Sequence, residues 1–219
     1  MPQRSVTAPA SARRRRSDGE LTRRRVLDAA VESILESGYY HTSSNEIARR
    51  AGVTWGTLQH QFGSREALLL EVLNDWWADL QTAVATAKIT GTTLEERLAC
   101  VLQVLAGHYG KPAHLAQLQI LLDLTQNPTT SAETRKSALE HGQALSRAWQ
   151  PLFHHALGEA SKEPDLVAYA FTTLRGYLVS DLVSRTAKQR DNRIERDLLV
   201  RGVAAAVRDE AHLRGIEVD

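Results

Sequence analysis

The chain contains few of the residues that build disulfide-linked, cysteine-metal or membrane structures. Only one of its 219 residues is cysteine, Cys100, which excludes an intrachain disulfide and a cysteine-based zinc cluster and fits a reducing compartment. No segment approaches the roughly 18 uninterrupted apolar residues of a transmembrane helix. The amino-terminal arginines are not followed by the apolar segment of a secretory signal. We therefore expect a cytoplasmic protein without a membrane partner.

Aromatic residues are also scarce, at 5%, but the apolar fraction of 42% is enough for a packed core in one large domain or two small ones. The net charge of +1 is unevenly distributed. Residues 1–66 contain 11 arginines and 7 acidic residues, whereas residues 67–219 contain 16 basic and 19 acidic residues. This asymmetry indicates that the first third of the chain meets a polyanion.

The spacing of apolar residues and of capping residues predicts an all-α fold. Residues 1–19 have little to bury, so they read as a disordered basic arm. A helix is then expected over 21–38, with Gly38 as its stop. Two short helices follow, the first capped by Thr42 or Ser43 and ended by Gly52, and the second running from Thr54 to about residue 62.

Ser64 is the natural N-cap of a long helix over 65–87. Further helices are expected at 94–108, 112–126, 132–157, 165–187 and 193–213. Pro151 predicts a kink in the helix at 132–157, or its division into two. The whole pattern predicts a three-helix head of about 65 residues and a carboxy-terminal bundle of about six helices.

The segment SNEIARRAGVTWGTLQHQFG, residues 44–63, has the spacing of a helix-turn-helix. Ile47 and Leu58 are apolar anchors, Ala48 is small where the helices cross, Gly52 permits a positive φ in the turn, and Val53 fills the corner. The alternative is a helical hairpin without a role in DNA binding.

Residues 38–69 resemble the amino-terminal domain of the TetR family of bacterial repressors. The resemblance rests on Gly38-Tyr39, Thr42-Ser43, Ile47-Ala48, Ala51-Gly52-Val53, Gly56-Thr57-Leu58, His60, Phe62, Ser64 and Glu66-Ala67-Leu68. It implies a homodimer whose variable helical domain binds a small molecule and thereby releases operator DNA. Beyond about residue 90 the resemblance is architectural only. The expected division is an arm at 1–19, a DNA-binding domain at 20–66, and a ligand-binding and dimerisation domain at 67–219.

The resemblance also implies which residues meet double-stranded DNA. The second short helix would present to the major groove Thr54, Trp55, Thr57, Gln59, His60 and Gln61. Gln59 stands where the family commonly has a phosphate-binding tyrosine, but its side-chain amide can form two hydrogen bonds to adenine. Trp55 either contacts sugar or a thymine methyl group or covers the helix junction. Expected near phosphates at helix N-termini are Thr42, Ser43, Asn45 and Arg65.

The arm has two interpretations. The arginines of this region, Arg13, Arg14, Arg15 and Arg16 together with Arg23–Arg25, either wrap the duplex or enter the minor groove, or they form a solvated tail.

The last two predicted helices are apolar on more than one face, which favours a four-helix dimer interface over a large monomeric core. Candidate ligand-binding residues are the inward groups of the central helices: Trp76, Leu80, Leu102, Leu105, His108, Leu118, Leu122, Trp149, Phe153, Phe171 and Arg175. Apolar residues at helical spacing more often pack in the core than bind a ligand. Arg175 either orients a polar group of the ligand or forms an ion pair at the edge of the site. We expect a largely apolar effector.

No pattern of catalytic residues is present. The sequence lacks a phosphate-binding glycine loop and a nucleophile elbow, and adjacent His154 and His155 diverge by about 100° on a helix. We therefore expect no enzyme, no cofactor and no metal. The predicted function is a repressor released by a small molecule. The alternatives are a helical small-molecule-binding protein, a ligand-independent DNA-binding activator, and a protein that binds membrane surfaces through its arm.

Overall fold

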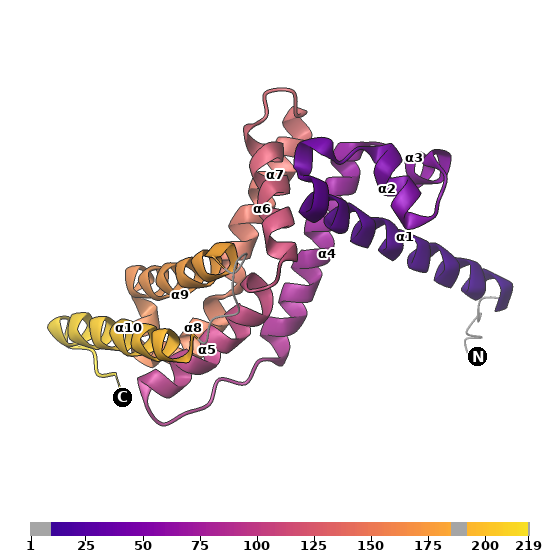
Figure 1. The fold of residues 1–219 in the computed structure, drawn as a ribbon. Coiled ribbons are helices and arrows are strands. Elements are labelled where there is room, and N and C mark those ends of the chain that lie inside the picture. Colours follow the sequence, from indigo (N-terminus) through magenta and orange to yellow (C-terminus); the bar gives the residue numbers. More distant parts are fainter. Residues whose placement is uncertain (1–9, 185–191, 219) are drawn as a thin grey trace, which may run out of the picture. The chain divides into compact units, whose positions relative to one another are not determined.

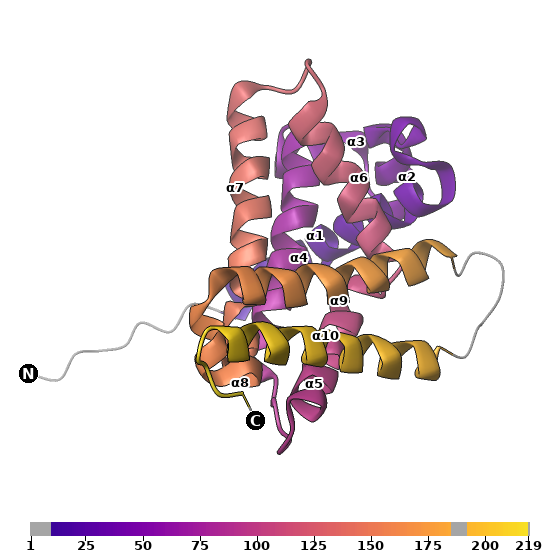
Figure 2. The same ribbon diagram turned by 90° about the vertical axis from the view of Figure 1, so that its left-hand side faces the viewer.

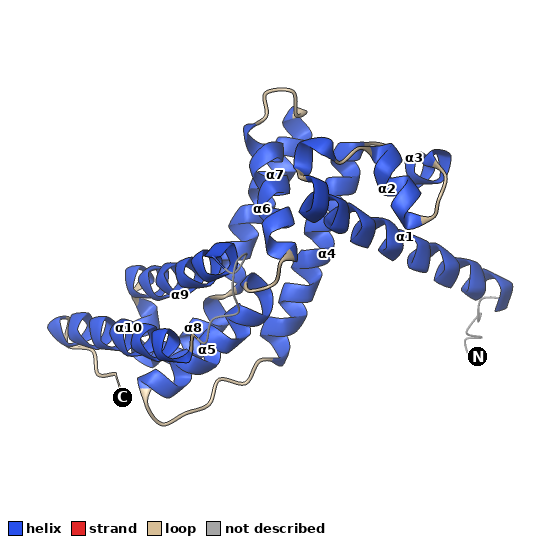
Figure 3. Ribbon diagram, in the orientation of Figure 1, coloured by secondary structure: helices blue, strands red, loops and turns tan. Residues whose placement is uncertain are grey.

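The computed structural model describes residues 10–184 and 192–218, and all regular elements in these residues are helices (Figures 1 and 3). They are α1 (Ala10–Ser37), α2 (Ser44–Ala51), α3 (Trp55–Phe62), α4 (Arg65–Thr86), α5 (Leu94–Tyr109), α6 (Ala113–Gln126), α7 (Ala132–Ala148), α8 (Gln150–Leu157), α9 (Pro164–Ser184) and α10 (Arg193–Leu213), with 3-10 turns η1 (Tyr39–His41) and η2 (Gly158–Lys162). The predicted all-α class is confirmed. None of the described helices has the length and apolar character needed to cross a membrane.

The described residues divide into two compact units. The first contains those up to Leu73 together with Ala116–Arg135, and the second contains Asn74–Leu115 and those from Lys136 onward. The division expected after residue 66 assigned all of α6 to the carboxy-terminal domain. In the structure α4 and α6 each run through both units.

Helix α1 begins earlier than predicted, at Ala10. Residues 10–19, expected to be disordered, continue the helix because alanine and arginine are strong helix formers and Gly19 is the one glycine among them. Residues 1–9 of the expected arm lie outside the described part of the chain.

The core of the first unit joins α1 to the two short helices. Val26, Ala30 and Ile34 of α1 are fully or nearly fully buried, as are Ile47 of α2 and Leu58 of α3. Gly52 ends α2 in the left-handed conformation, with φ 65°, and the next amide, of Val53, donates to the carbonyl of Ala48 over 3.0 Å. The helix-turn-helix predicted from residues 44–63 is confirmed.

The predicted caps also form. The Oγ of Ser43, rather than that of Thr42, accepts the Glu46 amide at the start of α2, over 3.2 Å. Thr54 caps α3, and Ser64 accepts the Ala67 amide at the start of α4. Near Pro151 the chain forms two helices, α7 and α8, that meet at Trp149, so division rather than a kink is the outcome.

Helix α5 is central to the second unit, where it packs against α8, α9 and α10. Its buried face includes Leu98, Val101 and Leu105. Helices α9 and α10 lie side by side (Figure 2). This packing places Trp76 of α4, Tyr109 of α5 and Phe171 of α9 in one core.

We expect Gly52→Ala to destabilise the first unit by roughly 1 kcal/mol, because a residue with a Cβ is strained at φ 65° although no atom lies within 4 Å of the added group. Gly19→Ala is the matched control in α1, where an added Cβ also meets nothing within 4 Å, and it should stabilise by about 0.5–1 kcal/mol. Urea unfolding of both variants measures the difference. Equal effects would contradict the role given to the turn.

Candidate functional site

One face of α3 is polar and open to solvent. Thr54, Thr57, Gln59 and His60 are exposed, and Trp55 is 55% exposed. The opposite face buries Leu58 and Phe62 against the rest of the first unit. Trp55 therefore does not cover the helix junction, which leaves its other predicted role, contact with sugar or a thymine methyl group.

The side chains of α3 differ in how much of their hydrogen-bonding capacity is already used. Thr57 bonds Thr54 through their hydroxyls at 2.9 Å, and the Gln59 amide nitrogen donates to the carbonyl of Gly63. Gln61 turns toward α1, where its amide nitrogen donates to the carbonyl of Gly19 at 3.4 Å. In this structure the Gln61 side chain therefore joins α3 to α1, and its contact with a DNA groove stays a prediction.

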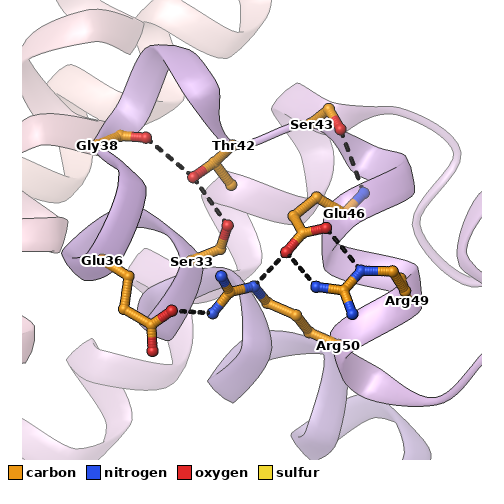
Figure 4. Close-up of polar contacts among 8 residues, drawn as sticks. All are labelled: Ser33, Glu36, Gly38, Thr42, Ser43, Glu46, Arg49 and Arg50. Carbon is orange, nitrogen blue, oxygen red and sulfur yellow. Dashed lines mark hydrogen bonds and ion pairs between the residues drawn. The ribbon is translucent and has the colours of Figure 1, made fainter.

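Two predicted phosphate contacts are structural instead. Thr42 is 2% exposed, and its hydroxyl donates to the Gly38 carbonyl at 3.0 Å and pairs with Ser33 at 3.1 Å (Figure 4). Arg65 donates to the carbonyls of Thr42 and Tyr39 over 3.2 and 3.1 Å. Both side chains hold the η1 turn, so both predictions are corrected, whereas Ser43 and Asn45 stay exposed at the start of α2.

Glu46 holds the two arginines of α2 in a network that the sequence did not reveal (Figure 4). Its carboxylate accepts from Arg49 over 2.8 and 2.7 Å and from Arg50 over 2.6 Å. Arg50 also donates to Glu36 over 2.6 Å. These hydrogen bonds from Arg49 and Arg50 lower the pKa of Glu46 to about 2. Glu46 faces the arginines and not the amide of Ser43, so only the Ser43 half of a capping box forms at the start of α2.

Tyr39 attaches the second half of α6 to the helix-turn-helix. Its hydroxyl donates to Asp123 over 2.7 Å, and its amide donates to Gln119 over 3.3 Å. Burial, followed by the hydrogen bond to Asp123, raises the pKa of Tyr39 well above its ordinary value. Sequence reasoning missed this contact because the partners are 84 positions apart and carry no local signal.

The predicted arm arginines lie on the first turns of α1. The side chains of Arg13, Arg14, Arg15 and Arg16 are outside the described part of the structure. Further along α1, Arg23 pairs with Glu71 and Arg24 pairs with Asp28.

The second unit contains an aromatic cluster drawn from several helices, and we define it as Trp76, His108, Tyr109, His114, His141, Trp149 and Phe171. Trp76 stacks on His108 with centroids 4.3 Å apart and planes 12° from parallel. Tyr109 contacts Trp149 at 5.4 Å and Phe171 at 6.3 Å. Of the predicted ligand residues, the structure brings Trp76, His108, Trp149 and Phe171 together, with Phe153 beside Phe171 at 6.0 Å.

Leu80, Leu102 and Leu105 are buried in the same core. Two predicted ligand residues do not join the cluster. Leu118 and Leu122 belong to the first unit, and Leu122 is 60% exposed. No sequence pattern indicates that α6 passes from one unit to the other within its first turn. Tyr109, His114 and His141 were missed, although Tyr109 directly follows the helix expected at 94–108 and the two histidines lie in those expected at 112–126 and 132–157, so their ring character was a usable signal.

Several polar atoms in the cluster are buried. The indole nitrogen of Trp149 donates to the hydroxyl of Tyr109 over 2.7 Å. The Nε2 atoms of His108 and His141 have no hydrogen-bond partner among the described residues. Burial lowers the pKa of His108 to about 3, with the charges of His114 and Lys111 acting in the same direction, and burial also lowers the pKa of His141. Both rings are therefore neutral near pH 7.

Within residues 10–184 and 192–218, no cluster of three or more histidine, cysteine, aspartate or glutamate side chains could hold a metal ion. His154 bonds Ser161 and His155 bonds the Pro151 carbonyl.

Residues 26–72 match the family model described as bacterial regulatory proteins, tetR family. These residues include the helix-turn-helix formed by α2 and α3. The HTH-type transcriptional regulator BetI of Agrobacterium fabrum is 33% identical over 84 residues, which are 38% of this chain and 41% of that relative. The chain thus matches about two fifths or less of the length of its curated relatives.

Solved structures extend the likeness of the fold beyond this domain. A transcriptional regulator from Rhodococcus sp. Rha1 has a TM-score of 0.61 at 17% identity, over 86% of this chain and 96% of that one. The transcriptional regulator FadR of Bacillus subtilis, in complex with stearoyl-CoA, has a TM-score of 0.55 at 19% identity, over 84% and 96% of the two chains. At these identities the likeness concerns the fold.

We expect stability to fall in acid because of His108. Its folded pKa lies below the unfolded value of about 6.5, so its contribution is complete above pH 6.5 and is lost as the pH falls toward 3. Between pH 7.5 and pH 5.0 the free energy of unfolding should drop by about 2 kcal/mol from this group. Urea titrations of wild type and His108→Gln at both pH values measure it, and the variant should lose less. An equal loss in both proteins counts against the assignment.

Proposed function

We propose that the protein is a DNA-binding transcriptional regulator, and specifically a repressor that a small-molecule effector releases from operator DNA. The observation that carries the proposal is the solvent-facing polar side of α3 within a helix-turn-helix of the tetR family. In such motifs the second helix enters the major groove and its outward side chains read base edges.

In this proposal Trp55, Thr57, Gln59 and His60 face the bases. The Gln59 amide and the His60 ring supply hydrogen bonds, and the Trp55 ring supplies apolar contact with sugar or thymine methyl groups. Ser43 and Asn45, with the free amides at the start of α2, contact phosphate. Arg13, Arg14, Arg15 and Arg16 extend the phosphate contacts along α1.

The outer faces of α9 and α10 support a homodimer. Tyr169 of α9 is 44% exposed, and Leu198 and Ile194 of α10 are 55% and 76% exposed. These apolar side chains lie on adjacent helices, so a two-fold axis beside them would bury all of them in a four-helix interface. A dimer sets two copies of α3 at the spacing that DNA half-sites require, about 34–36 Å or a multiple of a helical turn.

The aromatic cluster is the proposed effector site, and its mostly aromatic side chains favour a largely apolar compound. Helix α6 carries His114 of the proposed effector site in the second unit and Asp123, which bonds Tyr39, in the first. The proposed protein is cytoplasmic and has no catalytic role.

Selection of bound DNA from a random pool should enrich one motif with two-fold symmetry. Gln59→Ala and His60→Ala should each weaken binding to that motif by about 5- to 150-fold, since a good base contact is worth about 1–3 kcal/mol. The control is Gln81→Ala, an exposed glutamine of α4 in the second unit, which should bind as wild type does. If no motif is enriched, the protein is not a sequence-specific regulator.

Replacing Arg13, Arg14, Arg15 and Arg16 by glutamine should reduce the dependence of DNA affinity on salt. The log–log slope should fall by about 0.9 for each phosphate that these arginines neutralise in the wild type. Glutamine nearly matches arginine in helix propensity, so α1 should persist. Affinities measured between 50 and 200 mM salt give the slope, and an unchanged slope would identify these arginines as a solvated helix end.

A further inference from the structure

The guanidinium of Arg175 has no acidic partner among the described residues. It lies on α9, a mostly apolar helix, and its Nε atom is buried without a hydrogen-bond partner. No carboxylate pairs with it anywhere in residues 10–184 and 192–218. Other arginines of the second unit do have acceptors: Arg208 bonds Glu95 over 3.0 Å and Arg214 bonds Asp165 over 2.7 Å. A partly buried guanidinium is costly unless it is paired, so its isolation indicates a missing partner.

The surroundings of Arg175 belong to the aromatic cluster. Its guanidinium carbon lies 5.2 Å from the centroid of the Tyr109 ring and 6.0 Å from that of Phe171. Tyr109 is fully buried, and its hydroxyl accepts from Trp149 while donating to no acceptor in the described residues. The neighbouring His108 is only 6% exposed and has an unpartnered Nε2. Unpartnered buried polar groups are rare in native proteins, and here Arg175 and His108, which both contact Tyr109, each have one.

These groups share one chemical preference. A guanidinium binds carboxylate and similar oxyanions through parallel hydrogen bonds, and a phenol hydroxyl donates to the same kind of oxygen. The neutral ring of His108 can donate as well. Since no member of the cluster is acidic, a cationic ligand would be repelled by Arg175 and have nothing to neutralise it.

We propose that the cluster binds an apolar organic anion, with Arg175 as the counter-ion of its carboxylate or sulfonate and with Trp76, Trp149 and Phe171 against its apolar part. The role of the bound ligand as an effector rests on the proposed function. The binding itself can be measured without DNA.

Two fluorescent probes that share one aromatic skeleton isolate the effect of the ligand's negative charge on binding. 8-Anilino-1-naphthalenesulfonate carries an anion, and N-phenyl-1-naphthylamine has the same two aromatic groups without it. In titrations of the full chain, Arg175→Gln should weaken binding of the sulfonate at least tenfold and change that of the amine less than twofold. Arg175→Lys should fall between wild type and Arg175→Gln for the sulfonate. The control is Arg201→Gln, which removes an exposed arginine paired with Asp197 and should alter neither probe.

A second pair of ligands needs no variant. In wild type, 1-naphthylacetate should displace the sulfonate probe at a concentration at least tenfold lower than 1-naphthylacetamide does. Equal displacement by acid and amide would overturn the proposal, as would equal weakening of both probes in Arg175→Gln or no weakening of either. If Arg175→Gln is unfolded by circular dichroism, Arg175→Met, which keeps an apolar stem, replaces it. Failure of these titrations leaves the DNA selection untouched, and failure of the selection leaves the anion site standing.

Discussion

The turn between α1 and α2 depends on the guanidinium of Arg65. It donates to the carbonyls of Tyr39 and Thr42 and to the hydroxyl of Tyr39, and it lies 4.5 Å above the Tyr39 ring. Without it, the carbonyl of Tyr39 would keep only its bond from the Thr42 amide, and the Thr42 carbonyl would lose the Arg65 hydrogen bond, at a cost of about 1–3 kcal/mol if it stays buried and unsatisfied. Because η1 precedes the start of α2, and Ile47 and Leu58 lock α2 and α3 into the core, Arg65 and Thr42 together help to position the exposed face of α3.

Local chemistry explains why the helix-turn-helix was predictable. Ser43, Thr54 and Ser64 each bond an amide three positions ahead, and Gly52 needs its positive φ whatever surrounds it. The roles of Thr42, Gln61 and Arg65 were not predictable in this way. A polar residue near a helix N-terminus can bind DNA or stabilise the fold, depending on which groups lie opposite its side chain. Ser33 lies opposite Thr42 and Tyr39 lies opposite Arg65, and both partners are at least nine positions away in sequence.

The same distinction divides the candidate ligand residues. Helical spacing identifies an apolar face, which is why Trp76, His108 and Trp149 were found. It does not identify in which of the two units that face packs. Helix α6, for example, belongs to the first unit from Ala116 onward. Leu118 and Leu122 were consequently assigned to the wrong core, and Tyr39 and Asp123 were not paired. The unpaired state of Arg175 is likewise invisible in sequence, where any nearby acid is a possible partner.

The continuity of α6 limits how a bound molecule could influence the DNA-binding side. His114 contacts Trp76 and Tyr109, and Gln119 and Asp123 hold Tyr39 five and nine positions further along the same helix. A hydrogen-bonded helix transmits displacement along its axis, since each residue rises only about 1.5 Å on the last. A ligand shifts an equilibrium only by its difference in affinity between two states. Tight binding at the aromatic cluster is therefore not sufficient for regulation: the ligand must favour one state of the protein over another, and α6 is the helix that carries both His114 and the two residues that bond Tyr39.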